Sequence, residues 1–181
     1  MLDKNLIFFQ VALFELEDIS ITKEDIKNFE NKYNIKLPDD YIEFLLDYDG
    51  FGLNSGSIIN NKSGIIYNKY IDENRNLQYY YSLQELIDDI EDETATRYNI
   101  SKECFLPKKM IAMASGDGNE WEVCLSYDEK TFGQIYYWGV WSENEFDFLC
   151  NSFTELLEGY YFIETDDNGL AIGEEKIFRI E

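Results

Sequence analysis

The 181-residue chain contains no histidine, and this absence excludes several kinds of catalytic site. Histidine is the commonest general base and the commonest side-chain ligand of transition metals. Ser-His-Asp and Cys-His catalytic arrangements are therefore excluded outright. No glycine-rich phosphate-binding loop of the P-loop or Rossmann kind is present either.

Cysteine and proline are also scarce. The three cysteines are odd in number, far apart and without a CxxC pair. A disulfide framework or a zinc site is not expected, and we interpret Cys104, Cys124 and Cys150 as buried free thiols in a reducing compartment. The chain has only two prolines, and we find no low-complexity linker and no internal repeat.

The chain has no apolar run of the roughly 18 residues needed to cross a bilayer. Its first residues, MLDKNLIFFQVALFELED, have an apolar centre but no basic flank and no small-residue cleavage site. This pattern is not that of a signal peptide. We expect a cytoplasmic protein.

Basic residues are few, with 15 Lys and Arg against 37 Asp and Glu, so the formal net charge is −22. A field of this sign opposes phosphate backbones and anionic membrane surfaces, so we expect no nucleic-acid or membrane partner. The same field attracts a complementary surface. The charge therefore favours a basic protein as the partner.

The composition provides ample core material, because apolar residues make up 45% of the chain and aromatic residues 17%. A chain of this length buries about two-thirds of its extended surface when it folds as one domain. We therefore predict a single globular domain over residues 1–181.

Start signals predict four helices. Thr22, Ser82 and Ser152 each precede an acidic residue by three positions, as in a capping box. The other helix follows Pro38, which suits the first helical position, and its buried stripe ends before Gly50. For the last helix, the predicted buried face consists of Phe153, Leu156, Leu157 and Tyr160.

β-branched and aromatic residues bounded by turn residues predict strands at 64–70, 108–115, 120–127 and 132–139. Residues 175–180 form a candidate edge strand, and residues 5–15 fit either a strand or a helix. The order of elements predicts an α+β fold, with a central antiparallel sheet of about five to six strands flanked by about four helices.

Acidic pairs invite a metal or catalytic interpretation, which the spacing does not support. A calcium loop starting at Asp47 would need a carboxylate at its twelfth position, where the chain has Ile58. A loop starting at Asp117 has Trp121 at its fifth position. Acid-only hydrolysis needs two carboxylates of different pKa across a cleft, and nothing in the sequence selects a pair. We predict no metal, no cofactor and no enzymatic activity.

The run QELIDDIEDE at residues 84–93 carries six acids and no base. It is typical of a solvated helix face, and it also fits an acidic docking surface; the sequence leaves both interpretations open. Aromatic residues at 79–81, 136–138 and 141 alternate across strands, so one face is core. Those on the other face are candidate interface anchors.

Four sequence motifs follow one another along the chain. The first is ITKEDIKNFENKYNIKLPDDYIEFLLDYDGFG, at residues 21–52. It is followed by SLQELIDD, by MIAMASGDGNEWEVCLSYDEKTFGQIYYW and by NSFTELLEGY. In this order the motifs resemble the SUKH superfamily, which includes the yeast cell-wall assembly regulator (Smi/Knr-type) domain. Asp49 replaces the usual Asn before the glycine. The core covers about residues 21–161, and residues 162–181 resemble a C-terminal extension.

The resemblance implies a bacterial immunity protein that binds and neutralises a cognate polymorphic or contact-dependent toxin, for instance a nuclease. It also leaves open a regulatory scaffold of the cell-wall-regulator type. The family has no shared catalytic residues, so the resemblance implies none here. The partner-binding candidates, chosen for charge density, are Asp88, Asp89, Glu91, Asp92, Glu93, Asp117 and Glu120.

Overall fold

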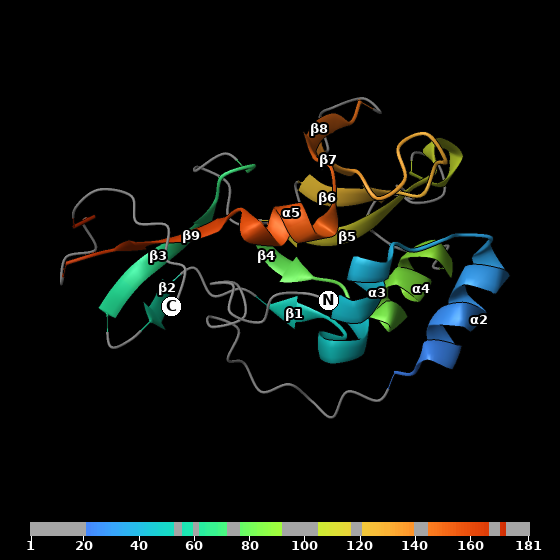
Figure 1. Ribbon diagram of the computed structural model, residues 1–181, viewed down its shortest axis with the longest axis horizontal. Helices are drawn as coiled ribbons and strands as arrows, with labels where there is room; N and C mark the ends of the chain where they lie inside the picture. Colours follow the sequence, from blue (N-terminus) through green and yellow to red (C-terminus); the bar gives the residue numbers. More distant parts are fainter. Residues whose placement is uncertain are drawn as a thin grey trace.

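Two antiparallel sheets and four helices make up the part of the chain that the computed structural model describes, which is residues 21–52, 56–59, 62–71, 77–91, 105–116, 121–139, 145–166 and 171–172. The main sheet has six strands in the order β1-β4-β5-β6-β7-β8, and the second has three in the order β2-β3-β9. Helices α2, α3 and α4 gather at one end of the molecule, and the second sheet lies at the other (Figure 1).

The elements have the following bounds. The helices are α2 (Lys23–Tyr33), α3 (Asp39–Tyr48), α4 (Leu83–Glu91) and α5 (Phe153–Glu158), with a short 3-10 helix at Leu106–Lys108. The main sheet consists of β1 (Phe51–Gly52), β4 (Leu77–Tyr80), β5 (Met110–Gly116), β6 (Trp121–Ser126), β7 (Ile135–Gly139) and β8 (Asp147–Cys150). The second sheet consists of β2 (Gly56–Ile59), β3 (Lys62–Asn68) and β9 (Tyr160–Glu164).

The predicted helix starts are confirmed by their capping hydrogen bonds. At α2, the Thr22 backbone N–H donates to Asp25 Oδ2 at 2.8 Å, and the Asp25 N–H donates back to Thr22 Oγ1 at 3.3 Å. At α4, Ser82 and Glu85 make the same reciprocal pair at 2.8 and 3.2 Å. At α5 only half the box forms: the Glu155 N–H donates to Ser152 Oγ, whereas the Glu155 carboxylate accepts from the Asn151 N–H.

Helix α3 differs in two details from its prediction. Pro38 has extended backbone angles and lies just before the helix, so Asp39 takes the first helical position. At the other end, Asp49 adopts the left-handed conformation with φ 39° before Gly50 at φ 96°. Asp is among the few residues that tolerate this region, because its short side chain finds a local or nearby donor.

The predicted strands correspond to β3, β5, β6 and β7, and the α+β class is confirmed. The sequence did not predict β1, β2, β8 or β9, nor that β3 pairs with β9 in a separate sheet. For β4, only the alternation of the aromatic residues at 79–81 indicated a strand. Tyr160 was predicted on the buried face of the last helix; it is buried, but it begins β9 because α5 ends at Glu158. Residues 5–15 and 175–180 lie outside the described residues, and the single-domain limits remain a prediction.

The core joins α3 and α5 to the main sheet through aromatic side chains. The Phe153 ring lies 5.1 Å from that of Tyr41, 5.0 Å from that of Phe44 and 5.9 Å from that of Tyr80. The buried Tyr80 and Tyr160 hydroxyls form a hydrogen bond of 2.8 Å. Edge-to-face pairs of this kind stabilise beyond their buried area. The cluster holds the helices in fixed positions on the sheet.

None of the helices in the described ranges has both the length and the hydropathy to cross a bilayer.

Candidate interaction site

Of the seven acidic residues predicted to bind a partner, three lie in the part of the chain that the structure describes and four do not. Asp88, Asp89 and Glu91 lie on α4. Asp92 and Glu93, which follow α4, and Asp117 and Glu120, between β5 and β6, lie outside the described residues. Their joint role in partner binding stays a prediction.

The three predicted contact residues on α4 have different surroundings. Asp88 is exposed and accepts a hydrogen bond of 2.7 Å from Gln84 Nε2, one turn earlier. Asp89 is half-buried, and its charge adds to the burial and to the Glu122 charge that raise the pKa of Cys124. Glu91 accepts hydrogen bonds from Lys32 Nζ and from the Tyr33 hydroxyl of α2. Of the three, Asp88 is therefore the most available to a partner.

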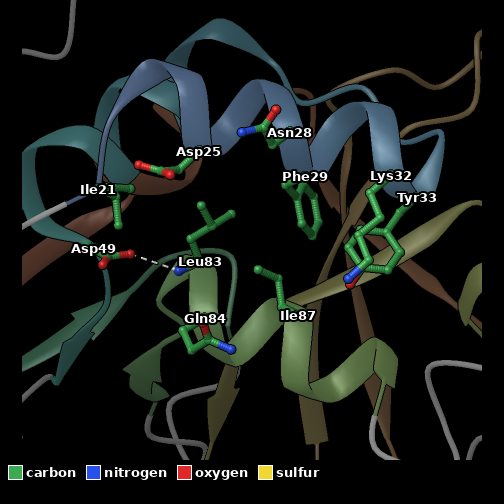
Figure 2. A pocket seen from close by; sticks show the side chains of 10 residues that line it. All are labelled: Ile21, Asp25, Asn28, Phe29, Lys32, Tyr33, Asp49, Leu83, Gln84 and Ile87. Atoms are coloured by element: carbon green, nitrogen blue, oxygen red, sulfur yellow. Dashed lines mark hydrogen bonds between the residues drawn. The ribbon is translucent and has the colours of Figure 1, made fainter.

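A cavity of about 470 Å³ lies between α2 and α4, and we call it the α2–α4 groove (Figure 2). Its lining residues are Ile21, Asp25, Asn28, Phe29, Lys32, Tyr33, Asp49, Leu83, Gln84 and Ile87. Phe29 and Leu83 are buried, and they form the apolar floor with the half-buried Ile87. Volumes of this size suit a few side chains or a small ligand.

Polar side chains surround this apolar floor. Asp25 and Asn28 come from the exposed side of α2, and Gln84 comes from α4. In Figure 2, Ile21, Asp25 and Asp49 lie at one end of the groove, and Lys32 and Tyr33 lie at the other. The groove therefore has an acidic end and an end closed by the bonds from Lys32 and Tyr33 to Glu91.

Asp49 connects α3 to α4. Its Oδ1 accepts a hydrogen bond of 2.8 Å from the Leu83 N–H, one of the donors at the start of α4 that have no partner within the helix. Burial raises the pKa of Asp49; the Leu83 bond opposes this rise, and the nearby Glu85 charge adds to it. The carboxylate is thus held in a place where its negative charge is poorly solvated.

Asp25, at the same end, is stabilised in its charged form. The hydrogen bond from the Thr22 hydroxyl, at 2.6 Å, is the main cause of its lowered pKa, and the Thr22 N–H adds to it. A carboxylate that accepts hydrogen bonds from nearby donors favours the ionised state. The acidic end therefore carries negative charge at neutral pH.

A buried hydroxyl lies close to this region. The Tyr41 hydroxyl is fully buried and has no hydrogen-bond partner among the described residues, and its pKa is raised by burial first and then by the charges of Asp49 and Glu85. The hydroxyl is therefore a neutral group. It does not offset the charge of the two carboxylates.

The described ranges show no cluster that could hold a metal ion, and neither of their cysteines is an activated nucleophile. No three His, Cys, Asp or Glu side chains there come together in a way that could hold a metal ion. Cys124 and Cys150 are buried free thiols, as predicted, and burial raises the pKa of Cys150 to about 12. Thiols in this state react poorly, because the thiolate is the nucleophile. Cys104 lies outside the described residues.

In the aromatic series that supplied the predicted interface anchors, Tyr79, Tyr136 and Tyr137 are half-buried, whereas Tyr80, Tyr81 and Trp138 are buried. Trp141 lies outside the described residues. Phe148 on the edge strand β8 is 53% exposed, with its ring 5.8 Å from that of Tyr136. This small aromatic surface is separate from the groove, and the sequence did not single out Phe148.

The sequence analysis also missed the α2–α4 groove. A signal was present, because Asp25, Asn28 and Lys32 recur at helical spacing and so share one face of α2, and Ile21 extends the same spacing just before the helix. The partner face on α4 could not be found from sequence, because Lys32 and Glu91 are 59 positions apart.

The comparison with known families agrees with the resemblance. A search of curated proteins finds no significant match. The family model described as "SMI1 / KNR4 family (SUKH-1)" matches residues 20–159, which is most of the chain and close to the 21–161 range expected from the motifs. The chain therefore belongs to the SMI1/KNR4 (SUKH-1) family.

Proposed function

We propose that this protein is an immunity protein that binds a cognate toxin and neutralises it by covering the toxin's active site or substrate path. The family assignment carries the proposal, because the SUKH-1 family includes immunity proteins. The net charge of −22 then sets the chemistry of the expected partner, which is a basic protein such as a nuclease.

The physical basis is charge complementarity. A nuclease needs a basic surface to hold its polyanionic substrate. An acidic inhibitor can occupy that surface and associate rapidly, because its field guides the approach. On α4, the exposed Asp88 and its neighbours supply a negative surface of the required sign.

Co-expression with the product of the neighbouring gene tests the proposal. We expect that product to stop growth when it is expressed alone. We expect this protein to restore growth and to co-purify with the product. If the product is toxic and this protein neither rescues growth nor co-purifies with it, the proposal is wrong.

A pair of charge-reversal variants tests the acidic surface. Asp88→Lys, on α4, should weaken binding, because it places a positive charge opposite a basic partner. Asp147→Lys makes the same change in net charge at an exposed aspartate on β8. Equal effects of the two variants on the dissociation constant would mean that only the net charge matters and that α4 is not at the interface.

The regulatory scaffold remains the alternative. It predicts that the neighbouring product co-purifies but does not slow growth when it is expressed alone. The same co-expression experiment therefore separates the two functions.

A further inference from the structure

The α2–α4 groove combines an apolar floor with charge at one end. Phe29 is 2% exposed and Leu83 is 3% exposed, so each of these side chains presents only a small surface to the groove. Figure 2 shows the side chains of Leu83 and Ile87 directed into the space between the two helices, opposite Phe29. The half-buried Ile87 adds further apolar surface, and the cavity of about 470 Å³ leaves room for an apolar side chain from outside.

The two ends of the groove differ in net charge. At one end, the bond to Glu91 offsets the charge of Lys32, whose ammonium also lies 5.0 Å from the centre of the Tyr33 ring. At the other end, Asp25 and Asp49 bring two carboxylates to the lining. No ion pair to either carboxylate occurs within the described residues. The field inside the groove is thus negative at the Asp25 and Asp49 end.

A cation at this end would remove an unfavourable interaction within the protein. Asp49 lies close enough to Glu85 for the two charges to oppose one another, and burial limits how well water can screen them. An ammonium or guanidinium group beside Asp49 would offset both effects. The free energy gained by binding a cation beside Asp49 is greater than at a fully exposed carboxylate, where water already solvates the charge.

We propose that the α2–α4 groove is the docking site for one segment of the basic partner, in which a Lys or Arg lies beside a large apolar side chain. The cation binds between Asp25 and Asp49, and the apolar side chain lies on Phe29, Leu83 and Ile87. This inference rests on the proposed function, since it names the part of the protein that binds the basic partner.

The charges favour this occupant over segments of the chain itself. The residues just before Ile21 include Glu15, Glu17 and Asp18, which carry the same sign as the acidic end. A second copy of the chain carries a net charge of −22. Like charges disfavour both occupants, whereas a basic segment is attracted.

Two asparagines on α2 provide a matched test in the full chain. Asn28 lines the groove, and Asn31 on the same helix does not; both are exposed. Asn28→Arg places a positive charge and a long side chain in the groove, while Asn31→Arg makes the same change beside it. We expect Asn28→Arg to weaken binding of the neighbouring gene's product by about tenfold or more, and Asn31→Arg to leave it within about threefold of wild type.

The measurement is a calorimetric titration, with melting temperatures to show that both variants are folded. Hydrogen exchange gives a second readout, because binding should protect the amides of residues 23–33 and 83–91. If the wild-type chain binds the product and Asn28→Arg binds it equally well, the inference that the groove is the docking site is wrong, and the proposed function stands. If the wild-type chain does not bind the product, the proposed function fails and the docking site fails with it.

Two other results would identify a different occupant and overturn the inference. If Asn28→Arg lowers the melting temperature far more than Asn31→Arg but leaves binding unchanged, the groove holds a segment of this chain. If light scattering detects a dimer that Asn28→Arg dissociates, the groove holds a second copy.

Discussion

At the scale of single residues, Asp40 connects two helices that are distant in the sequence. Its Oδ2 accepts hydrogen bonds from the Thr154 N–H at 2.8 Å and from the Thr154 hydroxyl at 2.9 Å, in the first turn of α5. We expect Asp40→Ala to lower the free energy of unfolding by about 1–2 kcal/mol, because it removes a helix cap and leaves a donor without its partner. Urea denaturation measures this change.

The adjacent aspartate is the control for this prediction. Asp39 is exposed and lies in the first turn of α3, as Asp40 does. Both residues interact with the positive end of the α3 dipole, so Asp39→Ala removes that interaction but leaves the Thr154 bonds in place. An equal loss of stability in the two variants would contradict the role given to Thr154.

Asp49 gives a prediction about pH. Its pKa is higher in the folded protein than the ordinary value of 3.8, so the folded state binds the proton more tightly than the unfolded state does. The stability that this difference contributes is present below pH 3.8 and is lost as the pH rises through the folded-state pKa of Asp49. Asp49→Asn keeps an oxygen that can accept from the Leu83 N–H, but it does not titrate.

We therefore expect Asp49→Asn to gain stability relative to wild type as the pH rises from about 3 to about 7. Urea denaturation of both proteins across this range measures the difference. Asn also tolerates the left-handed conformation at this position, so the substitution should not strain the backbone. Two stability curves that stay parallel across the range would contradict the assigned pKa shift.

At the scale of elements, Gly116 on β5 lies directly against the Trp121 side chain of β6. A Cβ at this position would lie 1.8 Å from Cε2 of Trp121, which begins β6 and is 4% exposed. We expect Gly116→Ala to lower the free energy of unfolding by about 1–3 kcal/mol, because the indole has to shift within a packed interior. Urea denaturation followed by tryptophan fluorescence measures both the stability and the shift.

Gly52→Ala in β1 is the matched control. Among the described residues, a Cβ there would meet only Tyr79 Cδ2, at 3.8 Å, which is an ordinary contact. Where the backbone suits alanine, this change stabilises a protein by about 0.4–1 kcal/mol through the unfolded state. The two Gly→Ala variants should therefore move stability in opposite directions, and a loss of similar size in both would contradict the steric explanation.

The elements that could be predicted are those whose signals are local. Three of the four helix starts depend on a side chain and a backbone N–H three positions apart, so a short stretch of sequence contains the whole signal. Strands β6 and β7 combine β-branched or aromatic residues with bounding turn residues, and β5 has the short apolar run MIAMA. By contrast, β1 has two residues and β8 has four, which is too short for a pattern to emerge.

The end of α5 shows why the rest could not be predicted. Tyr160 continues the helical spacing of Leu156 and Leu157, so the sequence favours a longer helix. In the structure, Asn68 Nδ2 donates a hydrogen bond of 2.8 Å to the Leu156 carbonyl from 88 positions away. Gly159 fits closely against Asn68, and β9 then pairs with β3. Only the tertiary contact decides where this helix ends.

The candidate site, too, could be predicted only where its signal is local in the sequence. Charge density along the sequence identified the acidic face of α4, including Asp88. The groove beside it required α2, α4 and the end of α3 to come together, which the sequence does not specify locally. The notable acids at Asp40 and Asp49 cap α5 and α4 from a distance, a role that spacing alone could not reveal.

At the scale of the whole molecule, the charge of −22 opposes the compact state, because folding brings 37 acids closer together with only 15 bases among them. Salt screens this repulsion, since the Debye length falls from about 30 Å at 0.01 M to about 8 Å at 0.15 M. We expect the melting temperature at neutral pH to rise as NaCl increases over this range, as calorimetry can measure. Near the isoelectric point of about 4.1 the net charge vanishes, and the salt effect should shrink with it. A melting temperature that falls with salt at neutral pH would mean that local ion pairs, such as Lys109 with Asp128 at 3.2 Å, outweigh the overall repulsion.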